Sequence, residues 1–114
     1  MAGDTAVDIE AMRGLLLEER ETLLRESAAT AGDRAPVELD QQTVGRLSRI
    51  DAMQVRAMAE ASETRRQGRL QRIDAALRRV ADGSFGECLQ CGEPIPPRRL
   101  EIDPAVTVCV PCAG

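Results

Sequence analysis

The chain has no histidine, tryptophan or tyrosine among its 114 residues, and Phe85 is its single aromatic residue. A core without these side chains must be built from Leu, Ile, Val, Met and Ala, and this composition favours paired helices over a sandwich or barrel. No paired-acid motif accompanies the missing histidine, so the sequence offers no recognisable catalytic site. We therefore expect a mainly α protein without enzyme activity.

Long apolar runs and a targeting signal are also absent from the sequence. No run approaches the roughly 18 apolar residues of a membrane span, and the first residues form neither a basic nor an apolar region. The formal net charge is −4, whereas general binding to DNA phosphates needs clustered positive charge. These features predict a cytoplasmic protein with no membrane partner and no sequence-specific binding to DNA.

All four cysteines of the chain fall into two Cys-x-x-Cys pairs. Cys88 and Cys91 form the first pair, and Cys109 and Cys112 form the second after 17 intervening residues. Each two-residue gap lets both thiolates of a pair converge on one ion, and four thiolates satisfy tetrahedral zinc. The spacing predicts one structural zinc ion held by these four residues.

Other roles for the cysteines fit the sequence less well. Two disulfides need an oxidising compartment, for which the sequence has no secretory signal. A redox dithiol is typical of a single pair in a βαβ pattern, and a catalytic zinc needs an open coordination position. Gly86 and Gly92 flank the first pair and can supply the positive φ values of a tight metal-binding turn, which favours the zinc interpretation.

Two helical patterns precede the cysteines. The first runs to about Thr30, with Thr5 or Asp4 as its N-cap. Gly14 interrupts it, either as a tolerated defect or as a close helix crossing. Its apolar face contains Ile9, Met12, Leu16 and Leu23, broadened by Leu15, Leu17 and Leu24.

The second pattern runs from about Gln41 to Asp82, with Asp40 as N-cap and Gly83 as the C′ residue. Its stripe contains a polar gap, and its members are Val44, Leu47, Asp51, Val55, Met58, Ser62, Leu70, Ile73, Leu77 and Val80. Two long helices joined by a short loop predict an antiparallel hairpin, or coiled coil, that projects from a small zinc-finger module.

The predicted organisation is therefore a helical hairpin over residues 1–82, with its tip around 31–53, followed by a four-cysteine zinc finger over 83–114. The finger is too small to fold on its own core, so zinc ligation must supply the difference. Arg98 and Arg99 are expected to face solvent, with Leu100 turned inward. The remaining apolar residues expected to pack in the finger are Phe85, Leu89, Ile95, Ile102, Val106, Val108 and Val110.

Arginines crowd residues 65–79 of the second helix, where Asp74 is the only acid. This stretch is either an ordinary solvated helix face or a docking surface for an acidic partner or for phosphates. The crowded residues are Arg65, Arg66, Arg69, Arg72, Arg78 and Arg79.

A characteristic order of motifs ends the chain. It comprises the runs Asp82–Cys88, Cys91–Ile95 and Arg98–Glu101, then Pro104 and the second cysteine pair. Over about residues 70–114 this order closely resembles the DksA/TraR family of bacterial transcription regulators, and the preceding helical hairpin agrees with the family's general architecture.

The resemblance implies RNA polymerase as the partner and no enzyme activity. In that family the coiled coil enters the secondary channel of the polymerase, and acidic residues at its tip approach the active-site magnesium. Promoter complexes are thereby destabilised or remodelled, often together with ppGpp. For this chain the resemblance implies a regulator of initiation, with Arg65, Arg66, Arg69, Arg72, Arg98 and Arg99 as the predicted docking residues.

The tip differs from the family's Asp-x-x-Asp-x-Ala motif. The nearest match, Ser48–Met53, keeps one of the two acids, Asp51, and ends in Met where the motif has Ala. The predicted tip residues are Asp51, Ala52 and Ser48, with Asp33 and Asp40 as possible substitutes for the acid.

The family's ppGpp site is also changed. Family members that bind ppGpp have three basic residues there, of which Arg72 fits the one on the second helix. Asp103 and Ala113 stand in place of the other two. Because a carboxylate repels a polyphosphate at close range, we expect no response to ppGpp through this site.

Two other classes of function fit parts of the sequence. In a zinc-ribbon that binds nucleic acid, Arg98 and Arg99 would make the leading contacts, but the finger has no stacking aromatic beside its cysteines. A helical protein-interaction module would use the hairpin itself. The polar gap in the second helix argues against a long self-paired zipper, so we expect a monomer.

Overall fold

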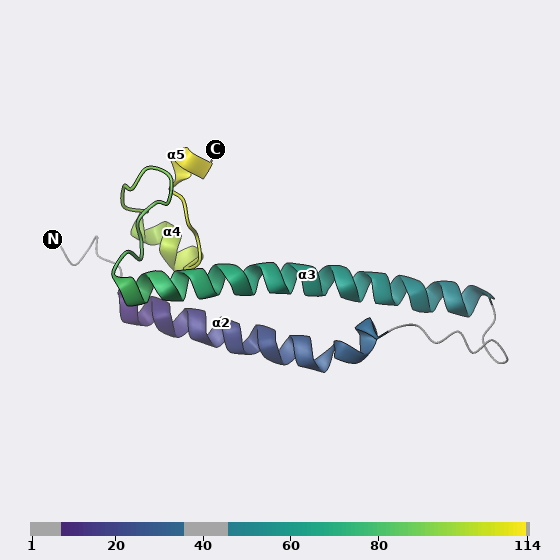
Figure 1. Ribbon diagram of the computed structural model, residues 1–114. Coiled ribbons are helices and arrows are strands. Elements are labelled where there is room, and N and C mark those ends of the chain that lie inside the picture. The colour runs from purple at the N-terminus through teal and green to yellow at the C-terminus, as the bar shows by residue number, and fades with distance from the viewer. Residues whose placement is uncertain (1–7, 36–45, 114) are drawn as a thin grey trace. The chain divides into compact units, whose positions relative to one another are not determined.

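The computed structural model describes residues 8–35 and 46–113, which form five helical elements (Figure 1). No strand occurs among these residues; Glu87 and Pro94 form an isolated antiparallel bridge. The mainly α fold is confirmed. The elements are α2 (Ile9–Ala29), the 3₁₀ helix η1 (Ala31–Arg34), α3 (Arg46–Asp82), α4 (Pro97–Ile102) and α5 (Val110–Ala113).

The chain divides into two compact units. The first unit comprises Met1–Glu21 and Arg69–Gly114, and the second comprises Thr22–Gly68. Each unit therefore contains a part of α2 and a part of α3. In the second unit, Glu26 pairs with Arg66 and Ser27 with Glu63, so residue numbers rise on α2 as they fall on α3. This order is that of an antiparallel helical hairpin, as the sequence predicts.

Asp8 caps the start of α2. Its Oδ1 accepts a hydrogen bond from the backbone N–H of Ala11 at 3.1 Å, and its carbonyl accepts one from Met12 at 3.0 Å. This geometry is that of an N-cap carboxylate, which also suits the positive end of the helix dipole. The predicted caps, Thr5 and Asp4, lie outside the described residues.

Gly83 ends α3 as predicted. Its φ is +87°, and the next residue, Ser84, donates from its backbone N–H to the carbonyl of Arg79 at 3.0 Å. This six-residue closure defines a Schellman motif, which favours glycine because of the positive φ. Asp82 strengthens the stop, since its Oδ1 accepts from both the N–H and the hydroxyl of Ser84. The predicted start of this helix lies outside the described residues.

Apolar burial between the two long helices is confined to the first unit. The buried residues there are Met12, Leu16, Leu70, Ile73 and Ala76. In the second unit none of the described side chains is buried. Val55 and Met58 continue the predicted stripe, yet their side chains are 55% and 71% exposed.

The apolar face predicted for α2 is narrower than expected. Ile9, Leu15, Leu17 and Leu24 are all exposed, and the buried part of the face consists of Met12 and Leu16. Gly14 is a tolerated defect, because a Cβ built there would meet no other atom of the described residues within 4 Å beyond its own helix. The alternative of a close helix crossing was wrong. None of the described helices combines the length and apolar character needed to cross a membrane.

Candidate metal centre

The four cysteines converge on one point of the first unit. All four Sγ atoms lie within 4.8 Å of one another, and the sulfurs of Cys91 and Cys109 are 3.7 Å apart. That separation is far longer than a disulfide bond, and all four thiols are free. Four mutually close thiol groups are the donor set of a closed, structural zinc site.

Tight turns hold the first cysteine pair in place. Gly86 and Gly92 have φ values of +90° and +77°, as the sequence predicts. Between them, Cys88 donates its N–H to the carbonyl of Glu93 at 2.8 Å, and Gly92 donates to the carbonyl of Cys88 at 2.9 Å. Ile95 closes the loop by donating to the carbonyl of Gly86 at 2.7 Å. The loop is therefore a hydrogen-bonded frame that sets the direction of both sulfurs.

The second cysteine pair sits at the start of α5. Ala113 donates its N–H to the carbonyl of Cys109 at 3.0 Å, which places Cys112 one helical turn after Cys109. The two knuckles are tied together by Leu89, whose N–H donates to the carbonyl of Thr107 at 2.8 Å. Backbone contacts thus bring the two knuckles together although 17 residues separate them in the sequence.

The sulfurs differ strongly in acidity. Backbone N–H groups, first that of Cys91, lower the pKa of Cys88 to about 6 because they stabilise its thiolate. The neighbouring sulfurs, first that of Cys109, raise the pKa of Cys112 to about 12 because they disfavour a further negative charge. A bound cation removes this repulsion, so the cluster is electrostatically suited to a divalent metal.

A small apolar cluster contains two of the four cysteines, whereas Cys91 is exposed. Cys88 and Cys109 are buried in it together with Ile95 and Leu100, and Phe85, Val106, Val108 and Cys112 pack against this core. The inward position predicted for Leu100 is confirmed, since its side chain is 1% exposed.

Three residues expected in this core lie on the surface instead: Leu89, Ile102 and Val110. Ile102 ends a short helix, and its side chain is 80% exposed. A core this small rarely stabilises a module by itself, so we expect the finger to depend on its metal.

The two arginines of the finger behave differently. Arg98 is exposed as predicted, whereas Arg99 is partly buried and donates from Nε to the carbonyl of Val108 at 3.0 Å. Arg99 therefore braces α4 against the segment that leads to the second cysteine pair. Its solvent-facing placement was only partly right, because its guanidinium serves the fold.

The arginine-rich stretch of α3 is not one solvated face. Arg65 and Arg72 are exposed, but Arg79 is buried. Arg69 pairs with Glu19 and with Asp103 in the first unit, and Arg66 pairs with Glu26 and Glu63 in the second. These acids belong mostly to other elements, and a reading of α3 alone misses them. Acids repeated along α2 opposite a basic stretch are the signal that could have revealed them.

The predicted tip residues lie near the start of α3 in the second unit. Asp51 and Ala52 are exposed. Ser48 belongs to the same helix, but its side chain lies outside the described part. Of the two substitute acids, Asp33 is exposed in η1, and Asp40 lies outside the described residues.

Comparison with known proteins agrees with this architecture. Residues 83–114 match the family model for the prokaryotic dksA/traR C4-type zinc finger. The chain is 35% identical over 105 residues to the RNA polymerase-binding transcription factor DksA of Caulobacter vibrioides, covering 90% of this chain and 70% of that protein. It is 40% identical over 43 residues to DksA of Escherichia coli, covering 38% of this chain and 28% of that protein.

Two solved structures have the same fold. Transcription factor DksA2 from Pseudomonas aeruginosa superposes with a TM-score of 0.75 at 28% identity, over 92% of this chain and 79% of that one. The DnaK suppressor protein from Agrobacterium tumefaciens gives a TM-score of 0.58 at 25% identity, over 99% and 97%. The clustered cysteines and the C4-type family fit one structural zinc ion, and the chain belongs to the DksA/TraR family.

Proposed function

We propose that this protein binds bacterial RNA polymerase and regulates transcription without catalysing a reaction of its own. The observation that carries the proposal is the similarity over 90% of the chain to a relative that is named an RNA polymerase-binding transcription factor. The similarity covers the helices as well as the zinc finger, so it is not limited to a metal-binding module. Such a protein would act in the cytoplasm, as a monomer and without reading a DNA sequence.

The helices would act as a probe and the zinc finger as its base. In this arrangement the end of α3 that carries Asp51 enters the secondary channel of the polymerase and approaches the active-site magnesium. Asp51 is exposed, so its carboxylate is available to a cation or to a basic partner. Arg65, Arg72 and Arg98 are exposed docking candidates, while Arg66, Arg69 and Arg99 also hold the fold together.

The proposed regulation does not depend on ppGpp through the family's usual site. Asp103 stands where a basic residue is expected, and its Oδ1 lies 2.9 Å from Nη1 of Arg69. The guanidinium of Arg69 could otherwise attract a polyphosphate, but here it is paired with Asp103. The carboxylate of Asp103 itself repels a polyphosphate. Direct measurement of ppGpp affinity should find no binding that depends on Arg72; an affinity lost in Arg72→Ala would sink this part of the proposal.

The test is a binding assay of the zinc-loaded protein with core RNA polymerase, together with transcription in vitro. Wild type should bind and change the yield of transcripts. Asp51→Asn should bind with similar affinity but lose the effect. Asp33→Asn tests the alternative acid in η1 and should keep both the affinity and the effect. If both variants act like wild type, Asp51 is not the acting acid. If wild type does not bind the polymerase, the proposed function is wrong.

A further inference from the structure

The second unit pairs its helices without a buried apolar residue among those described. Apolar contacts there are weak, because side chains such as Met58 remain largely in water. When an apolar seam does not define the register of two helices, specific polar contacts can define it instead. We therefore look to the polar contacts of this unit for what determines the register of its helices.

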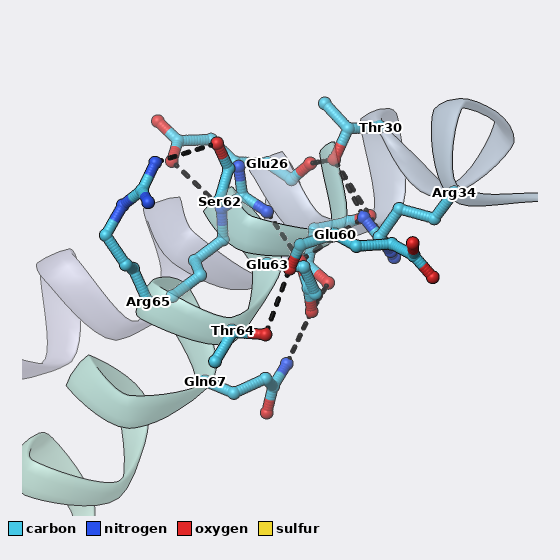
Figure 2. A network of polar contacts seen from close by, with 11 residues as sticks. Glu26, Thr30, Arg34, Glu60, Ser62, Glu63, Thr64, Arg65 and Gln67 are labelled. Carbon is cyan, nitrogen blue, oxygen red and sulfur yellow. Dashed lines mark hydrogen bonds and ion pairs between the residues drawn. The ribbon is translucent and has the colours of Figure 1, made fainter. Parts of the chain in front are cut away.

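These contacts converge on Glu63 (Figure 2). Its Oε2 accepts a hydrogen bond from the hydroxyl of Ser27 at 2.7 Å and another from Nε2 of Gln67 at 2.7 Å. Its Oε1 accepts from Nη1 of Arg66 and lies 3.2 Å from Nη1 of Arg34. One carboxylate of α3 thus joins the last turns of α2, the η1 turn and its own helix.

Arg34 carries the connection into η1. Its Nη1 also donates to Oγ1 of Thr30 at 3.0 Å, and its Nη2 donates to the carbonyl of Ser27 at 3.2 Å. Thr30 in turn donates its hydroxyl to the carbonyl of Glu26 at 2.8 Å. The carbonyls of Glu26 and Ser27 at the end of α2 therefore accept hydrogen bonds from the side chains of Thr30 and Arg34, and Arg34 also contacts Glu63.

The environment of Glu63 keeps it ionised. Its side chain is 15% exposed, and donors surround it on both oxygens. The hydrogen bond from Gln67, then those from Ser27 and Arg66 and the charge of Arg34, lower its pKa to about 2. A carboxylate held by several donors has few alternative arrangements, so it can fix the positions of the groups that bind it.

We propose that Glu63 is a positioning residue that fixes η1 and the end of α2 against α3 within the second unit. It thereby sets the register of the half of α3 that carries Asp51. The inference rests on the proposed function, because a shifted register of the two helices would be detected as a change in transcription. It assigns to Glu63 a role in action rather than in affinity. Of the exposed docking candidates, Arg72 and Arg98 lie in the other unit, and Arg65 donates to the hydroxyl of Ser62 rather than to Glu63.

The test compares Glu63→Gln with Glu60→Gln in the zinc-loaded full chain. Glu60 is a matched control because it lies one turn away on α3, its side chain is 52% exposed, and its carboxylate pairs with Arg56 of the same helix. The amide group that replaces Glu63 keeps its size but loses the charge and one acceptor oxygen. Arg34→Met removes the same connection from the η1 side and leaves the bonds of Glu63 to Ser27 and Gln67.

Three quantities are measured for each variant. Hydrogen exchange in residues 27–35 should become about tenfold faster in Glu63→Gln and in Arg34→Met but not in the control. Affinity for core polymerase should stay within about threefold of wild type. The maximal effect on transcription at saturating protein should fall about tenfold or more, because small misplacements of an acting group are costly. The double variant should be no worse than either single variant if both act through one connection.

Two results would overturn the inference. In the first, Glu63→Gln affects transcription at saturation as strongly as wild type. In the second, hydrogen exchange accelerates across both units while affinity and the effect on transcription fall together, which would make Glu63 a general support of the fold. If wild type itself fails to bind polymerase, the proposed function fails; unchanged exchange in Glu63→Gln would then separately reject the positioning role.

Discussion

Nη1 of Arg69 lies 2.9 Å from Oδ1 of Asp103, and this contact ties α3 to the zinc finger within one compact unit. The same guanidinium binds Glu19 of α2 with both remaining nitrogens, Nε at 2.6 Å and Nη2 at 2.9 Å. Asp103 also accepts a hydrogen bond from the N–H of Ala105 at 3.1 Å, so its carboxylate is fixed by its own turn. Glu19, Arg69 and Asp103 thus form an ionic triad. The side chain of Arg69 at its centre connects α2, α3 and the finger.

Replacing Arg69 should loosen that connection. Arg69→Met keeps most of the aliphatic stem but leaves two partly exposed carboxylates without their cation. We expect the free energy of unfolding of the zinc-loaded protein to fall by about 1–2 kcal/mol, more than for a typical surface ion pair because three charge-assisted bonds are lost. Urea unfolding checks this. The control Arg72→Met, at an exposed site one turn later, should stay within about 0.5 kcal/mol; equal losses in the two variants would contradict the role of the triad.

Gly14 offers a stabilising substitution. A Cβ at this position meets open space, and alanine has a helix propensity about 1 kcal/mol better than glycine in a helix interior. Gly14→Ala should therefore raise Tm by several degrees, since about 1 kcal/mol shifts a domain of this size by roughly 4–8 °C. Gly83→Ala should have the opposite effect because its φ is +87°. A lower Tm for Gly14→Ala would show that the glycine has a role other than that of a defect.

Removing zinc should unfold the finger selectively. The apolar core around Leu100 is small, and binding of a structural zinc supplies on the order of 10 kcal/mol in comparable modules. A chelator should greatly accelerate exchange of the N–H groups of Cys88 and Ile95, which donate to the carbonyls of Glu93 and Gly86 at 2.8 and 2.7 Å. Exchange in Thr22–Gly68 serves as the internal control. Retained protection at Cys88 after chelation would mean that the loop folds without its metal.

The metal centre could be predicted almost entirely from the sequence, because its determinants are local. Two-residue spacings place each pair of thiols, and the positive φ values of Gly86 and Gly92 follow from the chemistry of tight turns. The end of α3 at Gly83 is predictable for the same reason. In each case the residue type and its neighbours in the chain decide the conformation.

Contacts between distant segments could not be predicted in this way. Arg69 and Arg66 look like members of a solvated basic face until the acids of α2 and Asp103 come beside them. Ile102 and Val110 look like core residues because they are apolar, yet both are exposed. Their exposure depends on which side of α4 and α5 faces the cysteines, and local sequence does not decide that. Periodicity also overstated the apolar seam, since it marks a face of a helix but not whether a partner covers it.

The lowered pKa of Glu63 gives a prediction with a definite sign. Hydrogen bonds, first from Gln67, hold the pKa of Glu63 at about 2, below its ordinary value of 4.5. A carboxyl group with a depressed pKa stabilises the folded state fully above its unfolded pKa, and this contribution disappears as the pH falls through the folded pKa. At neutral pH, Glu63→Gln should therefore be less stable than wild type, and the difference should shrink between about pH 4.5 and 2.

Thermal unfolding of both proteins across this range, followed by circular dichroism, measures the difference. Acid also displaces zinc from thiolates, but it does so in both proteins, so only the gap between their Tm values reports on Glu63. The difference in Tm between Glu60→Gln and wild type should change little over this pH range. Glu60 is more exposed than Glu63, and its ion pair with Arg56 is longer, at 3.5 Å. A gap for Glu63→Gln that stays constant from pH 7 to pH 2 would mean that the charge of Glu63 does not stabilise the second unit.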